Sequence, residues 1–170
     1  TCTATIKKVW PLMVQDHREG VKSKIAKIAE NTLDISQFLV LNIGLEKVSF
    51  ATDDNKIAVS YHDPCHLKKS LGISAEPRAL IQANPCYRFK EMPESDSCCG
   101  MGGAFNLQNY EISASIGKRK RDNIVTSECS VVATGCPACM IQISDMLSQS
   151  GDRIKIRHPI EIYEELIIKP

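Results

Sequence analysis

The sequence has 170 residues, of which 43% are apolar and 24% are charged, so its size and composition are those of one globular domain and exclude a disordered tail or a large multidomain enzyme. The formal charge of +1 gives no global field that would hold nucleic acid or an anionic membrane. The sequence shows neither an apolar run of about eighteen residues nor a secretory signal pattern. We therefore expect a cytoplasmic protein with no nucleic-acid partner and no transmembrane segment, which would reach a membrane only through partners.

The N-terminal part of the sequence has helical patterns. Apolar residues at spacings of three and four predict helices over 3–14 and 21–31, and a third stretch, 35–41, fits a helix or a buried strand. We interpret the third stretch as a helix because Asp34 can cap its start and Gly44 can end it. Pro11 predicts a kink or a break in the first helix, and a turn is predicted at 53–55.

Strand and helix patterns alternate in the rest of the sequence. Short β-branched or alternating runs predict strands over 56–61, 87–92, 130–134 and 153–157. Helical spacing predicts helices over 75–83, 106–125, 137–148 and 159–168. This order predicts an α/β fold, in which a parallel β-sheet is flanked by helices on both faces in a Rossmann-like, three-layer arrangement.

Two stretches of the sequence are similar to each other. Cys2 opens a predicted helix that leads to LDISQFLVLNIGL, and Cys139 opens one that leads to RHPIEIYEELI. We interpret residues 1–50 as the C-terminal helical end of a preceding cysteine-rich repeat, with Cys2 as the last cysteine of a CxxC pair. Residues 51–170 would then form one complete repeat, and the sequence is expected to be a piece of a longer protein.

Eight cysteines are many for a chain of this length without an export signal. Disulfides suit small secreted domains without a core, and cysteines that only fill a core would be scattered. Five cysteines instead form three clusters, each after a predicted strand or its loop: Cys65, Cys98, Cys99, Cys136 and Cys139. Because ligands gather at the carboxyl ends of parallel strands, we expect these thiols to converge on a metal, which would keep them deprotonated.

The number of clustered cysteines bears on the metal. Five thiolates exceed the four ligands that zinc takes, which favours an iron-sulfur centre. The neighbours Cys98 and Cys99 bridge each other poorly as a disulfide but can ligate adjacent metal atoms. A zinc site stays open as an alternative, because four of the five cysteines, or three together with His66, could form a tetrahedron.

Two motifs around these cysteines have other possible meanings. In CCGMGG the glycines Gly100, Gly102 and Gly103 let backbone N–H groups approach sulfur, although the loop also resembles part of a phosphate-binding loop. It lacks the full GxGxxG and the GKS or GKT ending. CPAC resembles a thiol-disulfide exchange motif, but beside three further cysteines we interpret Cys136 and Cys139 as ligands, with Cys136 at a helix N-terminus.

The remaining chemically interesting residues have weaker signals. Cys86 and Cys129 lie outside the clusters, and we expect both to be buried structural cysteines. His62 and His66 flank Cys65 and could either hydrogen-bond to the ligands or have no role. The basic run 118–121 is expected to be a solvated helix face, with a docking patch for a partner as the alternative.

The segments YHDPCH, PRAL, EMPESDSCCGMGG and VVATGCPACMIQI together resemble the cysteine-rich CCG domain over residues 56–166. That family includes iron-sulfur subunits of glycolate and lactate oxidases, to which the likeness is greatest, and the B-type subunit of heterodisulfide reductases. The resemblance implies a 4Fe-4S cluster, noncubane in heterodisulfide reductases, and its five ligand positions correspond to Cys65, Cys98, Cys99, Cys136 and Cys139. Some members hold zinc in one repeat, so zinc stays the alternative cofactor.

The resemblance also implies partners. In the glycolate and lactate systems an FAD-containing dehydrogenase subunit oxidises the 2-hydroxy acid and passes electrons to the iron-sulfur subunit, which usually also has a ferredoxin-like domain. The CxxCxxCxxxC run of that domain is not in this sequence, so a ferredoxin-like domain or subunit is expected as a partner. We therefore expect an electron-transferring oxidoreductase subunit, with no catalytic residue assigned. The alternatives are disulfide reduction at a noncubane cluster and a zinc-stabilised docking module.

Overall fold

The computed structural model describes residues 2–14, 19–45 and 55–168. Its central element is a sheet of four strands, which are all parallel and lie in the order β2-β1-β3-β4. The strands are β1 (Ile57–Tyr61), β2 (Tyr87–Phe89), β3 (Val131–Ala133) and β4 (Lys155–Arg157). In this register Val59 of β1 is paired with Phe89 on one side and with Val131 on the other.

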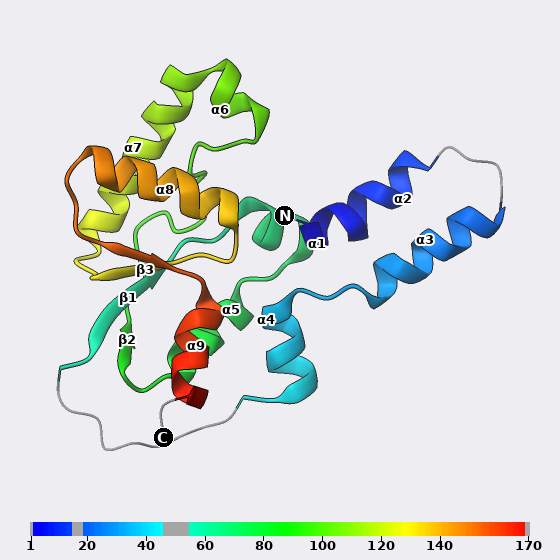
Figure 1. Ribbon diagram of the computed structural model, residues 1–170, viewed down its shortest axis with the longest axis horizontal. Coiled ribbons are helices and arrows are strands. Elements are labelled where there is room, and N and C mark those ends of the chain that lie inside the picture. The colour runs from blue at the N-terminus through cyan, green and yellow to red at the C-terminus, as the bar shows by residue number, and fades with distance from the viewer. Residues whose placement is uncertain (1, 15–18, 46–54, 169–170) are drawn as a thin grey trace.

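Helices cover both faces of this sheet (Figure 1). On one face α5 packs against α9, and on the other α7 packs against α8. These helices are α5 (Ala75–Ala83), α7 (Tyr110–Thr126), α8 (Pro137–Gln149) and α9 (Pro159–Ile168). The arrangement confirms the prediction of a three-layer α/β fold with a parallel sheet.

The side chains of β3 pack into two separate hydrophobic clusters, one on each face of the sheet. Successive residues of a strand point to opposite faces of the sheet. Val131 and Ala133 accordingly pack in the core cluster that contains Ile162 of α9, whereas Val132 packs in the cluster that contains Ile143 of α8. The second cluster also contains three of the clustered cysteines, so the α7–α8 face of the sheet is the face that carries the cysteine site.

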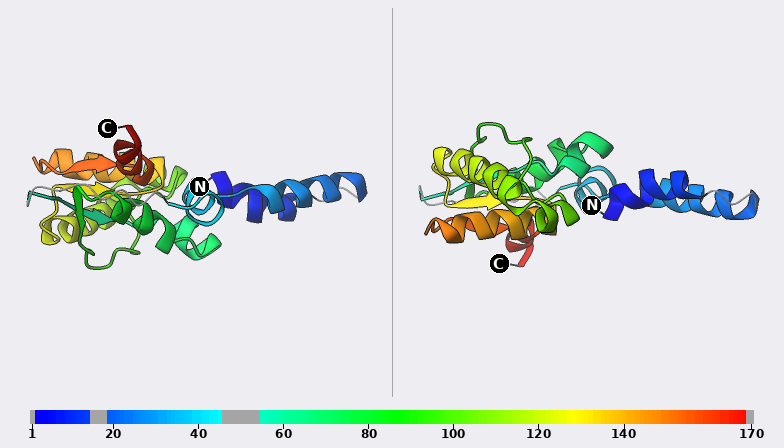
Figure 2. Two further views of the ribbon diagram at one scale, coloured as in Figure 1. Left: turned by 90° about the horizontal axis from the view of Figure 1, so that it is seen from below. Right: turned by 90° about the horizontal axis from the view of Figure 1, so that it is seen from above.

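The N-terminal segments are helical, as predicted, and the elements up to residue 31 extend away from the sheet (Figure 2). The first helical segment consists of α1 (Cys2–Ala4), a π-helical stretch η1 (Thr5–Val9) and α2 (Trp10–Met13). The second is α3 (Glu19–Asn31), and the third consists of α4 (Ile35–Gln37) and the π-helical η2 (Phe38–Ile43). Contacts join α1 to the segment after β1, and α4 and η2 to α5.

Local signals explain the ends of these helices. The backbone N–H of Ser36 donates to the Asp34 carboxylate at 2.9 Å, and Gly44 ends the third helical segment with a φ of 83°, as predicted. Pro11 does not break the first helical segment, which continues to Met13. Pro11 lies in the first turn of α2, where its missing N–H is tolerated, and the π-helical irregularity precedes it. Residues 53 and 54 of the predicted turn lie outside the described residues.

Two of the predicted strands were too long. The strands predicted over 87–92 and 153–157 extend only over β2 and β4. Both are edge strands that pair with a neighbour on one side only, so the alternating pattern continues beyond the residues that have a ladder partner. Among the described residues, no helix combines the length and the hydropathy that crossing a membrane requires.

The helix predicted over 106–125 is confirmed over most of its length, but the prediction that it is continuous is wrong. The chain forms α6 (Ala104–Gln108) and then α7, separated at Asn109, whose φ of −135° and ψ of 53° are not helical. Side-chain bonds favour this break, because the Asn106 amide donates to Ser113 Oγ at 2.8 Å and to Gln142 Oε1 at 3.0 Å. The break brings α6 back over the α7–α8 pair, and a continuous helix would not allow these bonds.

The buried face of α7 is less apolar than the sequence pattern over 106–125 suggests. Of the apolar residues in that pattern, Leu107 of α6 and Ile112 of α7 are exposed, whereas Ile124 is buried. The other buried residues of α7 are Ser113, Gly117 and Lys120. The space between this face of α7 and the neighbouring α8 is small, because a Cβ atom added to Gly117 would lie 2.8 Å from Met146 Cγ of α8. The small residues therefore let α7 approach α8 and the cysteine loop closely.

Candidate metal centre

A cavity of about 260 Å³ lies between the loops after β1 and β3, the CCG loop over 98–103 and the start of α8. All five clustered cysteines line it, together with both flanking histidines: His62, Cys65, His66, Cys98, Cys99, Cys136 and Cys139. The topology accounts for this convergence, because β1 and β3 are adjacent and parallel and their carboxyl ends meet at the same edge. The structure thus gathers the predicted residues around one cavity, while their role as ligands stays a prediction.

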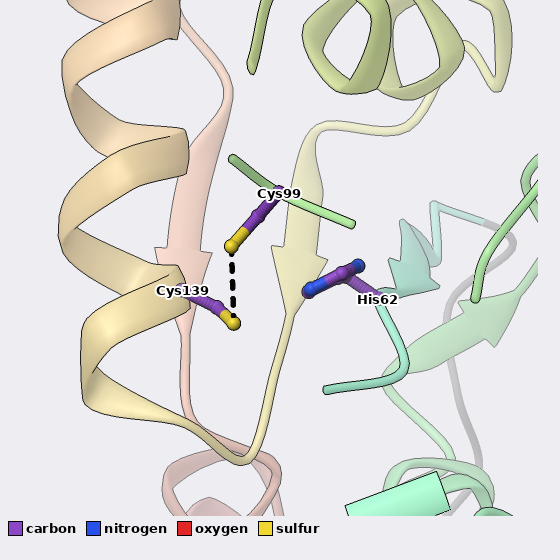
Figure 3. Close-up of side chains that lie close together, drawn as sticks. All are labelled: His62, Cys99 and Cys139. Atoms are coloured by element: carbon purple, nitrogen blue, oxygen red, sulfur yellow. Dashed lines mark hydrogen bonds between the residues drawn. The ribbon is translucent and has the colours of Figure 1, made fainter. Parts of the chain in front are cut away.

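The inner side of the cavity consists of buried groups. The Sγ atoms of Cys99 and Cys139 lie 3.2 Å apart, and both residues are buried. His62 lies beside them (Figure 3), and the three ligand atoms are all within 4.8 Å of one another. Cys136 is buried as well and lies at the N-terminus of α8, as predicted.

The outer side of the cavity is open to solvent. Cys65 is half-buried and Cys98 is exposed. Cys65 immediately precedes the π-helical segment η3 (His66–Ser70), and its Sγ lies 3.7 Å from Nδ1 of the exposed His66. Cys98 Sγ accepts the backbone N–H of Gly100 at 3.3 Å, so one of the three glycines directs its N–H at sulfur as expected.

His62 is the histidine that faces the buried thiols, a role that the sequence left undecided. Its Nδ1 is 3.2 Å from the carbonyl oxygen of Ser95. A carbonyl only accepts hydrogen bonds, so Nδ1 carries the proton and a neutral ring has its lone pair on Nε2. Nε2 is buried and has no hydrogen-bond partner among the described residues. A buried lone pair beside two thiols fits a bound metal or cluster.

The thiols strongly influence one another's protonation. Hydrogen bonds shared first with Cys139 and then with Cys98 lower the pKa of Cys99 far below its ordinary value. Hydrogen bonding to Cys136 and to Cys99 raises the pKa of Cys139, and bonding to Cys99 raises the pKa of Cys98. Without a metal, these thiols therefore share protons through their hydrogen bonds. A bound metal would displace those protons.

The CCG loop requires glycine at its third position. Gly100 has a φ of 95°, and a Cβ atom there would lie 2.4 Å from the backbone oxygen of Ser113. This close approach lets Ser113 Oγ donate to the Gly100 carbonyl at 2.8 Å. Because Ser113 also accepts from Asn106 and Gln142, the loop that carries Cys98 and Cys99 is fixed to both α7 and α8.

Asp63 fixes the loop that carries Cys65. Both oxygens of its buried carboxylate accept hydrogen bonds from Arg78, each at 2.8 Å, and Ser74 Oγ donates at 2.9 Å. Burial alone would raise the pKa of Asp63, but the bonds and charge of Arg78 and the bond of Ser74 lower it to about 2. The backbone N–H of Asp63 also donates to the Ser95 carbonyl at 3.0 Å, which joins the loop to the segment before Cys98.

The structure corrects two predictions about single residues. Cys86 is exposed and not buried; it lies in the turn before β2, where its backbone N–H donates to the Asn84 side chain. Cys129 is buried, as predicted. In the basic run 118–121 only part of the face is solvated, because Lys120 is completely buried.

Lys120 is thus a residue of this region that sequence reasoning missed. It lies on the buried face of α7, and its Nζ donates to the backbone oxygens of Glu94 at 2.6 Å and Ser95 at 3.3 Å. The signal was present as a spacing: Ser113, Gly117, Lys120 and Ile124 recur at intervals of four, three and four residues. The neighbouring charges in the sequence concealed this helical face.

Comparison with known proteins identifies the family of the chain. The profile of the CCG family, described as "Cysteine-rich domain", matches residues 59–144. A subunit of the fumarate reductase (CoM/CoB) of Methanothermobacter marburgensis is 35% identical over 164 residues, which are 96% of this chain and 30% of the relative. The probable glycolate oxidase iron-sulfur subunit of Bacillus subtilis is 30% identical over 134 residues, 79% of this chain and 30% of the relative.

A third relative belongs to another redox enzyme. It is a subunit of the dihydromethanophenazine:CoB–CoM heterodisulfide reductase of Methanosarcina barkeri, and it is 28% identical over 138 residues, 79% of this chain and 34% of the relative. The chain therefore spans about a third of the length of these relatives. The match to the family profile covers half of the chain, including all five clustered cysteines, and the chain belongs to the CCG family of cysteine-rich domains.

Proposed function

We propose that the chain is the iron-sulfur, electron-transferring part of a glycolate or lactate oxidase or dehydrogenase. The observation that carries the proposal is the cavity lined by five cysteines, in which buried and exposed thiols face one space. The name of the glycolate oxidase relative adds support, because it describes an iron-sulfur subunit. The cytoplasm is the proposed location, since its reducing conditions keep such thiols free.

The proposed cofactor is a 4Fe-4S cluster held by Cys65, Cys98, Cys99, Cys136 and Cys139. When bound, it would accept and release single electrons. The residues that line the cavity would have different roles in holding the cluster. Cys99, Cys136 and Cys139 exclude water from the inner side because they are buried. The lone pair of His62 Nε2 supplies a further donor atom on that side, and the glycine loop brings a backbone N–H to Cys98.

The proposed partners act at the open side of the cavity. A flavoprotein subunit would oxidise the 2-hydroxy acid on FAD and pass electrons to the cluster past the exposed Cys98 and half-buried Cys65. A ferredoxin-like domain or subunit would take them onward. Residues 1–50 remain proposed as the end of a preceding cysteine-rich repeat, whose own site would lie upstream of residues 51–170.

The test is electron transfer from the substrate through the partner. The full-length protein that contains this chain is purified without oxygen, alone and together with its flavoprotein. We expect glycolate or lactate to bleach the visible absorbance of the cluster only when the flavoprotein is present. A matched variant, Cys86→Ser, alters an exposed cysteine outside the cavity and should behave as the wild type. A cluster that neither substrate reduces in the presence of the flavoprotein would contradict the proposal.

A second candidate is direct reduction of a disulfide at a noncubane cluster. It is favoured by the open side of the cavity, where Cys65, His66 and Cys98 are accessible to a substrate, and by the name of the heterodisulfide reductase relative. In this case a heterodisulfide added to the reduced protein should oxidise the cluster and change its EPR spectrum without any flavoprotein. An unchanged spectrum over many enzyme turnover times would exclude this candidate.

A further inference from the structure

Lys120 is a buried cation close to the candidate cluster site. It is 0% exposed, although it belongs to a run of four basic residues whose other members reach the surface. Its Nζ donates to the backbone oxygens of Glu94 and Ser95. Removing an ammonium group from water costs several kcal/mol unless other groups compensate its charge, and two neutral carbonyls compensate it only in part. A negative charge nearby would therefore stabilise the protonated form of Lys120.

Acidic side chains near Lys120 supply this charge only in part, because they act on Lys120 without a direct ion pair. Among residues 2–14, 19–45 and 55–168, no carboxylate forms a salt bridge with Lys120. The three carboxylates whose charges act on it are each bound to another cation: Glu94 to Arg119, Asp63 to Arg78, and Asp96 to Lys68. A cation that carboxylates do not pair is unusual in a protein interior.

The cysteine site is a further negative group near Lys120. Burial lowers the pKa of Lys120 to about 8, and the largest charge that opposes this lowering is that of Cys99, ahead of Asp96, Glu94 and Asp63. A single atom connects the two sites structurally. The Ser95 carbonyl accepts from Lys120 Nζ at 3.3 Å and lies 3.2 Å from His62 Nδ1, and the other ring nitrogen of His62 lies beside Cys99 and Cys139.

The turn that receives Lys120 is held in an uncommon conformation. Glu94 has a φ of 49°, in the left-handed region that side chains other than glycine rarely adopt. This conformation accompanies the short bond of 2.6 Å from Lys120 Nζ to the Glu94 carbonyl. A residue with an unfavourable backbone conformation and a buried ammonium group thus occur together at this position.

We propose that Lys120 is a positioning residue whose charge offsets the negative charge of the cysteine-bound cluster and makes the cluster easier to reduce. The inference rests on the proposed function. Reduction transfers one electron from the flavoprotein to the cluster and adds one negative charge to it. A nearby cation stabilises the reduced state more than the oxidised state, so it raises the reduction potential.

The test compares three variants with the wild type in the full-length protein, purified without oxygen. Lys120→Met removes the charge and keeps a long apolar stem. Lys120→Gln also removes the charge but keeps a hydrogen-bond donor for the turn. Lys118→Met removes an exposed charge two residues away and is the matched control. Iron and sulfide per chain are measured first, and the reduced fraction is then followed by EPR at set solution potentials.

At the potential that half-reduces the wild-type cluster, we expect the reduced-to-oxidised ratio to fall about ten-fold in Lys120→Met, because the charge of a buried cation near the cluster is only partly screened. Lys120→Gln should show a similar fall, and Lys118→Met should match the wild type. If either loaded Lys120 variant kept the wild-type ratio, the role of Lys120 would be refuted. The absence of iron and sulfide from the wild type would instead refute the proposed function, and the inference with it.

Discussion

The two sides of the cysteine cavity differ in how firmly the fold holds them. On the inner side Cys99, Cys136 and Cys139 are buried in the same core cluster as Val132 and Ile143. On the outer side Cys98 is exposed and Cys65 is half-buried. The core therefore positions the inner thiols before any metal binds, whereas only loop contacts hold the outer ones.

The difference suits an electron-transfer site. A buried inner side excludes water and holds a cluster in place, and an open outer side lets a partner come close enough to exchange electrons. The two sides also have different supports. A hydrogen-bond network of Ser113, Asn106 and Gln142 holds the CCG loop, and the Asp63–Arg78 pair holds the loop of Cys65. Each support can be removed separately.

Removing an inner thiol should have the largest effect. We expect Cys99→Ala to abolish cluster binding, because the core offers no other group at that position, and to leave less than about a tenth of the wild-type iron and sulfide per chain. Cys86→Ala, at an exposed cysteine outside the cavity, should bind the full amount. Elemental analysis of anaerobically purified protein measures both. Full loading of Cys99→Ala would show that the inner thiols are not ligands.

The CCG loop should be nearly as sensitive to an added methyl group. Gly100→Ala forces a side chain into a φ of 95° and places Cβ 2.4 Å from the backbone of Ser113, so we expect a loss of about 3 kcal/mol in the free energy of unfolding. Gly20→Ala in α3 is the matched control. Its Cβ meets nothing within 4 Å, and the change should stabilise the protein by about 0.5 kcal/mol. Urea unfolding measures both, and equal stabilities would contradict the loop's role.

The support of the outer loop should depend on pH. The pKa of Asp63 in the folded protein, about 2, is below its ordinary value of 3.8, so its stabilising effect is complete above about pH 4 and is lost as the pH falls through about 2. Asp63→Asn should lower the free energy of unfolding at pH 7 by about 2 kcal/mol and flatten its decrease below pH 4. Asp145→Asn, an exposed position on α8, should keep the wild-type curve. Denaturant unfolding at several pH values tests this, and a decrease in Asp63→Asn as steep as in the wild type would contradict it.

The two histidines should show the smallest difference. We expect His62→Gln to lose iron to a chelator about ten-fold faster than the wild type, because the buried donor beside Cys99 and Cys139 is altered. His66→Gln, on the exposed side, should lose iron at nearly the wild-type rate. The decay of the visible absorbance gives both rates. A faster loss in His66→Gln than in His62→Gln would reverse the assignment of the inner and outer sides.

The sequence predicted the layers of the fold and the meeting of the cysteines for one physical reason. Alternating strand and helix patterns imply parallel strands, and parallel strands bring the residues that follow them to one edge of the sheet. Cys65 follows β1, and Cys136 follows β3. These relations are local in the sequence, so spacing alone was sufficient to predict them.

The features that sequence reasoning missed depend on contacts between distant residues. The break at Asn109 accompanies bonds from Asn106 to Ser113 and to Gln142 of another helix. The burial of Lys120 depends on carbonyl groups of the 94–95 turn, 25 or 26 residues away. Periodicity describes one helix at a time, so it places neither such bonds nor a buried charge within a basic run.

The central claim is that the cavity holds an iron-sulfur cluster. Its most direct test is the content of iron, zinc and acid-labile sulfide per chain in wild-type protein purified without oxygen. We predict about four irons with an equal amount of sulfide, as a 4Fe-4S cluster requires. About one zinc without sulfide would contradict the claim. It would instead assign His62, Cys99 and Cys139, with one further cysteine, to a structural zinc site.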